Sequence, residues 1–134
     1  MNYTVSYQGH LRTESTHLQS GTSVVTDAPT DNNGKGETFS PTDLVSSGLA
    51  SCMMTIVGIE ADKRGIELKE MRAEVTKKMA SSPRRIETIS ITLHLNAPKI
   101  NNNHKTVLLE AAKNCPVALS LHPNLNQELK VIFS

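Results

Sequence analysis

The sequence contains no tryptophan, and its aromatic side chains are limited to two tyrosines and two phenylalanines. A stacking platform for bases or sugars needs several exposed aromatic rings, so this composition nearly excludes one. Neither sign of charge is in excess, because 14 Lys and Arg are balanced by 13 Asp and Glu, for a formal net charge of +1. Without a basic stripe, binding to a nucleic-acid backbone is not expected.

Segments that address a protein to a membrane or for export are also missing. No apolar run approaches the roughly 18 residues of a transmembrane helix, and the N-terminal MNYTVSYQGH lacks the charged and then apolar parts of a signal peptide. These absences predict a cytoplasmic protein without a membrane partner. In that compartment Cys52 and Cys115, the two cysteines, are expected to be thiols, and a disulfide between them would be transient or catalytic.

Motifs for metals and cofactors are absent as well. The five histidines are scattered, without the i, i+4 or CxxC spacing of a zinc site. No P-loop, dinucleotide-binding glycine pattern or G-x-S-x-G motif occurs. We therefore expect no metal and no cofactor. The densest positive cluster is interpreted as a solvated strand end and consists of Lys77, Lys78, Arg84 and Arg85.

The longest periodic apolar segment of the chain is residues 40–65, SPTDLVSSGLASCMMTIVGIEADKRG. Its apolar residues recur at steps of three and four, which predicts a helix with Cys52 on the inward face. Ser40 and Asp43 form a capping-box pattern at the start of this helix, and Gly65 is suited to end it. Apolar or small residues cover more than one stripe, as is typical of a helix that is buried on all sides. We therefore expect a second subunit to cover it.

The rest of the chain predicts strands and shorter helices around this segment. Strands are expected at residues 2–7, 11–18, 22–27, 68–79, 86–95 and around 129–133, and helices at 107–114 and 116–121. The first three strands would form an antiparallel meander, and residues 28–38 a surface loop. With no internal repeat and no linker, residues 1–134 are expected to be a single α+β domain in which antiparallel sheet packs on helices.

Two cysteines and one arginine are the candidates for chemistry. A thiol on an apolar helical face usually behaves as a small buried hydrophobe, so position alone favours an inert Cys52, and the same holds for Cys115. Gly48, one turn before Cys52, would leave room beside the sulfur or let another backbone come close. A reactive Cys52 needs a nearby cation, because the helix dipole fades after the first turn. Arg12 could pair with a thiolate and an oxygen ligand together; the alternative is a solvated arginine facing Glu14.

The segments FSPTDLVSSGLASCMM and AAKNCPVALSL resemble the OsmC/Ohr family of osmotically inducible and organic hydroperoxide resistance proteins. The resemblance covers the whole chain and implies an OsmC-like fold in an intertwined homodimer with active sites at the subunit interface. It further implies that Cys52 attacks an organic hydroperoxide or hydrogen peroxide, and that Cys115 resolves the sulfenic acid as a disulfide. An external dithiol would reduce the disulfide, and Arg12 would hold the thiolate and the peroxide.

One position departs from the pattern of this family. Its peroxidases have Glu directly after the proline that opens the long helix, where the Glu pairs with the arginine; here Thr42 stands in its place. Asp43 is the nearest carboxylate, but it is expected in the capping box, and Glu37 in the preceding loop is a further candidate partner for Arg12. The alternative function is therefore a non-enzymatic protein that holds an apolar ligand in the interface pocket.

Overall fold

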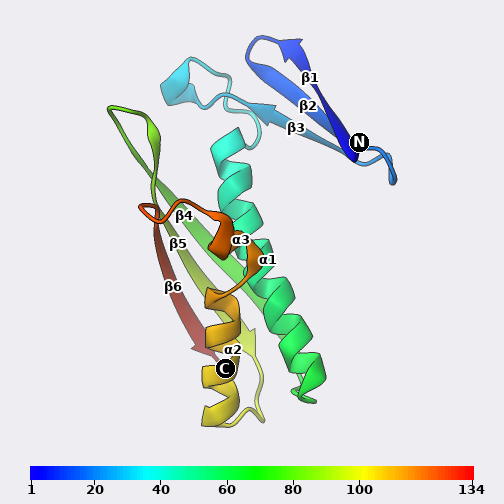
Figure 1. Ribbon diagram of the computed structural model, residues 1–134, viewed down its shortest axis with the longest axis vertical. Coiled ribbons are helices and arrows are strands. Elements are labelled where there is room, and N and C mark those ends of the chain that lie inside the picture. The colour runs from blue at the N-terminus through cyan, green and yellow to red at the C-terminus, as the bar shows by residue number, and fades with distance from the viewer. The chain divides into compact units, whose positions relative to one another are not determined.

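The computed structural model describes all residues from 1 to 134, and its elements follow the predicted order (Figure 1). The chain falls into two compact units, residues 1–45 and 46–134. The predicted α+β class is confirmed. The elements are β1 (Tyr3–Gly9), β2 (Arg12–His17), β3 (Ser23–Asp27), the 3-10 helix η1 (Thr30–Asn32), α1 (Pro41–Lys63), β4 (Glu70–Ala80), β5 (Arg85–Asn96), α2 (Asn102–Lys113), α3 (Pro116–Ser120) and β6 (Asn126–Phe133).

The first unit contains the predicted antiparallel meander, in the order β1-β2-β3. Gly9 pairs with Arg12, so the β1–β2 hairpin has a two-residue turn, His10 and Leu11, and both turn residues have positive φ values. Such a turn matches the right-handed twist of the strands it joins. The next connection, residues 18–22, joins β2 to β3 in a register that places Arg12 directly opposite Asp27 on β3.

The prediction that β1 is half-buried is wrong for this chain. Tyr3, Val5 and Tyr7 share one face of the meander, and each is more than 60% exposed. Their alternation predicted an apolar face, but no element of residues 1–45 covers it. The alternating sequence pattern therefore identified the apolar face of β1, but it did not show whether another element packs on that face.

The second unit contains a sheet in the order β4-β5-β6. β4 and β5 are antiparallel, as predicted, but β6 runs parallel to β5, so the expectation of purely antiparallel sheet is wrong here. The reason is the connection: α2 and α3 carry the chain back to the starting end of β5 before β6 begins, and a helical crossover of this kind joins parallel strands.

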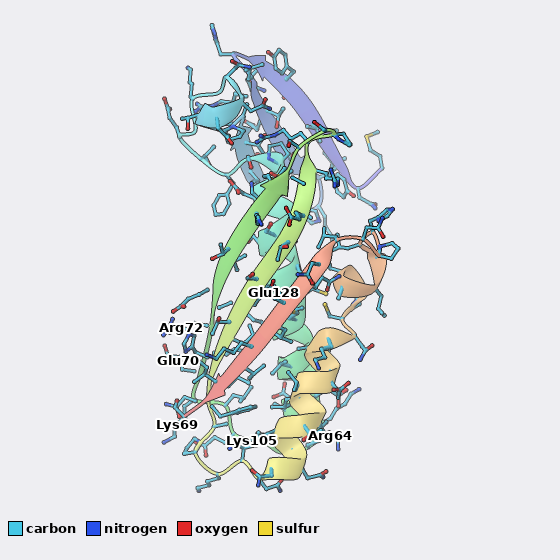
Figure 2. The ribbon with its side chains drawn as sticks, turned by 90° about the vertical axis from the view of Figure 1, so that its left-hand side faces the viewer. Arg64, Lys69, Glu70, Arg72, Lys105 and Glu128 are labelled. Carbon is cyan, nitrogen blue, oxygen red and sulfur yellow. The ribbon has the colours of Figure 1, made fainter.

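The helices pack on one face of this sheet. Figures 1 and 2 show α1 and α2 on the same side of β4, β5 and β6, while Arg72 and Glu128 stand on the strands in the view onto the other side. The buried core joins α1, β5, α2 and α3 and includes Leu49, Met53, Val57, Ala61, Ile89, Ile91, Leu93, Leu95, Leu108 and Ala112. The four-residue spacing along α1 and the two-residue spacing along β5 are those of a helix face and a strand face.

The apolar character of α1 corrects one expectation. The helix has 23 residues, and an 18-residue window within it reaches a mean hydropathy of 1.5, so by length and composition it is able to cross a membrane. The statement that no apolar run approaches this length is therefore wrong. A core helix of a soluble protein passes the same test. In this structure one row of the helix, Leu49, Met53, Val57 and Ala61, is buried in the core, and 33% of the apolar window is buried.

Candidate functional site

The two cysteines are neighbours in the second unit, although their sequence positions are far apart. Cys52 lies in α1 and is half-buried, whereas Cys115, between α2 and α3, is completely buried. Both are free thiols. The pKa of Cys115 is raised, chiefly by burial, and the nearby Cys52 sulfur raises it further. The structure thus brings together two sulfur atoms that sequence spacing alone could not place.

Local geometry holds Cys115 in position. Its Sγ accepts a hydrogen bond from the Ala118 amide at 3.5 Å, which caps the N-terminus of α3, and Pro116 occupies the first position of that helix. Proline suits this position because its missing N–H would be unpaired there. The Gln127 side chain on β6 donates to the Ala118 carbonyl at 3.0 Å. Cys115 is therefore anchored from α3 and, through Gln127, from the sheet.

Open space lies beside Gly48, one turn before Cys52 on α1. A Cβ atom built at Gly48 would meet no atom within 4 Å, apart from the backbone of the helix itself. Because residues four apart share a helix face, this space adjoins the face that carries Cys52. The pair therefore consists of a half-buried thiol and a completely buried thiol.

Arg12 belongs to the first unit and is held by two carboxylates. Its Nε donates to Asp27 Oδ1 at 2.7 Å and its Nη2 donates to Asp27 Oδ2 at 2.8 Å, which is the two-bond geometry that guanidinium groups form with carboxylates. Nη2 also donates to Glu37 Oε2 at 3.2 Å. Asp27 is 1% exposed and Glu37 is 64% exposed. Hydrogen bonding from Arg12 keeps the pKa of Asp27 below its usual range despite burial, and the pKa of Arg12 is raised correspondingly.

Asp27 also organises the loop at residues 28–38. Its Oδ2 accepts from the Glu37 amide at 3.2 Å, and its own amide donates to the Phe39 carbonyl at 3.0 Å. Gly34 fits tightly, since a Cβ there would lie 1.7 Å from the Ala28 carbonyl oxygen. The surface loop predicted from its composition is thus closed against the end of β3.

The other candidate partners of Arg12 lie at the start of α1. The Ser40 amide donates to Asp43 Oδ2 at 2.9 Å, and the Asp43 amide donates to Ser40 Oγ at 3.1 Å, so the predicted capping box is confirmed. The hydroxyl groups of Thr42 and Ser40 are 3.2 Å apart. Arg12 pairs with Asp27 and Glu37 rather than with Thr42 or Asp43. Sequence reasoning missed Asp27, although the hairpin register of the predicted meander would have placed it opposite Arg12.

No cluster of three or more His, Cys, Asp or Glu side chains is placed to hold a metal ion. The thiol pair and the held arginine are therefore the features from which chemistry can be argued.

Comparison with known proteins adds a family to these features. The family model for OsmC-like protein matches residues 34–130. The chain is similar to a solved structure from Psychrobacter arcticus 273-4, named for osmotic stress induction and a detoxification response, with 45% identity, a TM-score of 0.93, and coverage of 98% of this chain and 96% of that one. A search of curated proteins gives no match.

Two more distant structures share the fold. One is the organic hydroperoxide resistance protein OsmC from Legionella pneumophila, with 18% identity, a TM-score of 0.73, and coverage of 98% and 96% of the two chains. The other is an organic hydroperoxide resistance protein from Elizabethkingia anophelis with bound thiocyanate, with 15% identity, a TM-score of 0.73, and coverage of 100% and 97%. At these identities the likeness concerns the fold.

Proposed function

Since this chain belongs to the family of OsmC-like proteins, we propose that it serves in the defence against peroxide stress as a thiol-dependent peroxidase formed by one domain over residues 1–134. The observation that carries the proposal is the pairing of half-buried Cys52 with buried Cys115. A reactive thiol must meet its oxidant, and its resolving partner must meet only the oxidised product. The unequal exposure of the two cysteines fits this division of roles.

The reaction has two steps within the chain. The Cys52 thiolate attacks one oxygen of an organic hydroperoxide or hydrogen peroxide, the O–O bond breaks, and the leaving oxygen takes a proton to give an alcohol or water. Cys52 is then a sulfenic acid. Cys115 attacks this sulfur, a disulfide forms, and water leaves. An external dithiol returns both sulfurs to thiols by exchange and is itself oxidised.

The surroundings of each sulfur support these roles. Burial raises the pKa of Cys115, so at neutral pH it stays a protonated thiol while Cys52 meets the peroxide. Arg12 is assigned to stabilise the Cys52 thiolate and the peroxide oxygen, the role that the family resemblance implies. Of the three supporting candidates, Glu37 contacts Arg12, whereas Asp43 is used in the capping box with Ser40. Thr42 carries no carboxylate and cannot replace the glutamate.

A homodimer completes the proposal. Apolar side chains remain exposed on α1, where Ile59 is 44% exposed, and on β1, where Tyr3 and Tyr7 are 64% and 67% exposed. Surfaces of this kind are typical of protein interfaces. We expect sedimentation analysis at low concentration to find no folded monomer. A stable monomer with a native circular dichroism spectrum would contradict the interface site.

The deciding experiment is steady-state consumption of cumene hydroperoxide, tert-butyl hydroperoxide and hydrogen peroxide with a dithiol reductant. Cys52→Ser should abolish turnover. Cys115→Ser should stop at a sulfenic acid that excess peroxide drives to sulfinic acid. Arg12→Ala should slow the first step but still allow a slow oxidant to form the disulfide. Absence of turnover with every peroxide would refute the peroxidase.

The second candidate is a non-enzymatic protein that binds an apolar ligand. It is favoured by the open space beside Gly48 and by Thr42 at the position of the family glutamate. Saturable binding of an apolar fluorophore, unchanged in Cys52→Ser and combined with no peroxide consumption, would support this function. Unmodified thiols after exposure to millimolar peroxide would point in the same direction.

A further inference from the structure

We propose that Asp27 is the positioning residue of the peroxidase, and that it orients Arg12 in place of the glutamate that follows the helix-opening proline in the peroxidases of the family. This inference rests on the proposed function, because it concerns how the arginine of that site is held. It assigns a role to a residue that lies outside the long helix and outside both cysteine segments.

The first argument is the geometry of the pair. Both Asp27 oxygens are used, one on Nε and one on Nη2, at 2.7 and 2.8 Å. Two parallel hydrogen bonds fix the plane of the guanidinium as well as its position, which a single contact would not do. Asp27 and Arg12 are direct cross-strand partners on β3 and β2, so the pair is built on a sheet rather than on a flexible segment.

The second argument is the burial of the acid. Asp27 is 1% exposed, whereas the other partner, Glu37, is 64% exposed and makes one contact at 3.2 Å. Water and salt screen an exposed pair and weaken it. Asp27 is held in turn by the Glu37 amide, so its carboxylate is oriented before Arg12 meets it. The buried carboxylate therefore sets the position of the arginine, and Glu37 adds to it.

The third argument is that the two carboxylates leave one edge of the Arg12 guanidinium group unused. Arginine has five N–H donors, and those on Nε and Nη2 serve the two carboxylates. Nη1 makes no hydrogen bond or ion pair within the chain, and the side chain is 34% exposed. Asp27 thus holds one edge and leaves the two N–H groups of Nη1 for an anionic oxygen or a thiolate.

A purely structural role is the competing explanation, because Asp27 also closes the loop at residues 28–38. A double-mutant cycle separates the two. Asp27→Asn keeps the shape of the side chain but loses its charge and one acceptor, and should slow oxidation of Cys52 by cumene hydroperoxide roughly 10- to 100-fold, since small displacements of a catalytic group have effects of this size. In the Arg12→Ala background the same change should alter the rate less than about twofold.

Two further variants keep the test decisive. Glu14→Gln removes a negative charge two residues from Arg12 on the same strand and is the matched control, with a rate expected within about twofold of the wild type. Arg12→Lys keeps the charge of residue 12 but cannot bridge both Asp27 oxygens. It should show a loss similar to that of Asp27→Asn, and it decides the question if circular dichroism shows that Asp27→Asn does not fold.

The measurements are two second-order rate constants, one for oxidation of Cys52 by cumene hydroperoxide and one for alkylation of Cys52 by iodoacetamide in the Cys115→Ser background. A wild-type rate in Asp27→Asn or in Arg12→Lys would overturn the inference and leave the peroxidase intact. The inference would also be overturned if Asp27→Asn lowered the rate of Cys52 oxidation equally in the wild-type and Arg12→Ala backgrounds. If the wild type consumes no peroxide, the proposed function fails. Alkylation of Cys52 then decides alone: Asp27→Asn and Arg12→Ala must slow it together, and an unchanged alkylation rate in Asp27→Asn refutes the positioning role.

Discussion

Cys115 should react with an alkylating agent roughly 100-fold more slowly than Cys52 in the folded, reduced protein. The reagent reaches Cys115 only after α3 opens, and opening breaks three hydrogen bonds: Ala118 amide to Cys115 Sγ, Leu119 amide to the Cys115 carbonyl, and Gln127 side chain to the Ala118 carbonyl. At a net value of about 1 kcal/mol each, the opening costs about 3 kcal/mol. Because 1.4 kcal/mol corresponds to a factor of ten, this free energy gives roughly 100-fold protection. The raised pKa of Cys115 slows its reaction further.

The prediction can be tested on a single hydrogen bond. Gln127→Ala removes the contact to α3, worth about 1 kcal/mol, and should speed labelling of Cys115 about fivefold without changing that of Cys52. Asn126→Ala is the matched control, because Asn126 is exposed on the same strand and its side chain contacts Glu128 rather than α3. Timed iodoacetamide labelling followed by peptide mass spectrometry measures both cysteines in one sample.

The reasoning would be refuted if the two cysteines of the folded wild type were labelled at rates within about twofold of each other. Labelling in denaturant provides the reference, since unfolding should bring the two rates together. A Gln127→Ala protein in which Cys52 accelerates as much as Cys115 would indicate a general loosening of the fold instead of local release of α3.

Three further predictions concern stability. Leu93→Ala removes a fully buried side chain and should lower the free energy of unfolding by about 2–5 kcal/mol, whereas Thr92→Ala on the other face of β5 should change it by less than about 0.5 kcal/mol; similar urea midpoints for the two would contradict the assigned core. Ser40→Ala removes the oxygen that caps the Asp43 amide and should cost about 1 kcal/mol, read from the same curves; no loss would mean that the cap contributes little. Arg12 lowers the pKa of Asp27 in the folded protein. The ionised Asp27 therefore stabilises the fold fully above the pKa of an unfolded aspartate, roughly 3.9, and this stabilisation is lost as the pH falls through the pKa of Asp27 in the folded state. Urea unfolding of the wild type and Asp27→Asn should therefore converge at acidic pH, and a constant difference would disagree with an ionised Asp27.

Local signals explain why much of the fold was predictable. The limits of α1 follow from Ser40, Asp43 and Gly65, which are sequence neighbours of the turns that they cap or end. Strand β5 was predicted from Ile89 to Leu95 because alternation is a property of adjacent residues and one face of this strand is fully covered.

Non-local contacts explain the failures. The parallel direction of β6 depends on the path of α2 and α3, and the proximity of Cys52 and Cys115 depends on how two helices pack. The exposure of the β1 face depends on what covers it. The pairing of Arg12 with Asp27 was accessible in principle, because counting residues across the β2–β3 hairpin gives the register, but a one-residue error in that turn would have placed Asp27 on the opposite face from Arg12.

The crossover to β6 has a consequence for the newly made chain. Residues 126–133 follow both cysteines in the sequence, so the ribosome completes Cys52, Cys115 and α3 before it makes the strand that carries Gln127. During that interval α3 lacks its contact to the sheet, and β5 lacks its parallel neighbour. A chain in which β6 has not yet joined the sheet would therefore shield Cys115 less well than the folded protein does. The full difference in exposure between Cys115 and Cys52 is reached only when the last strand joins the sheet.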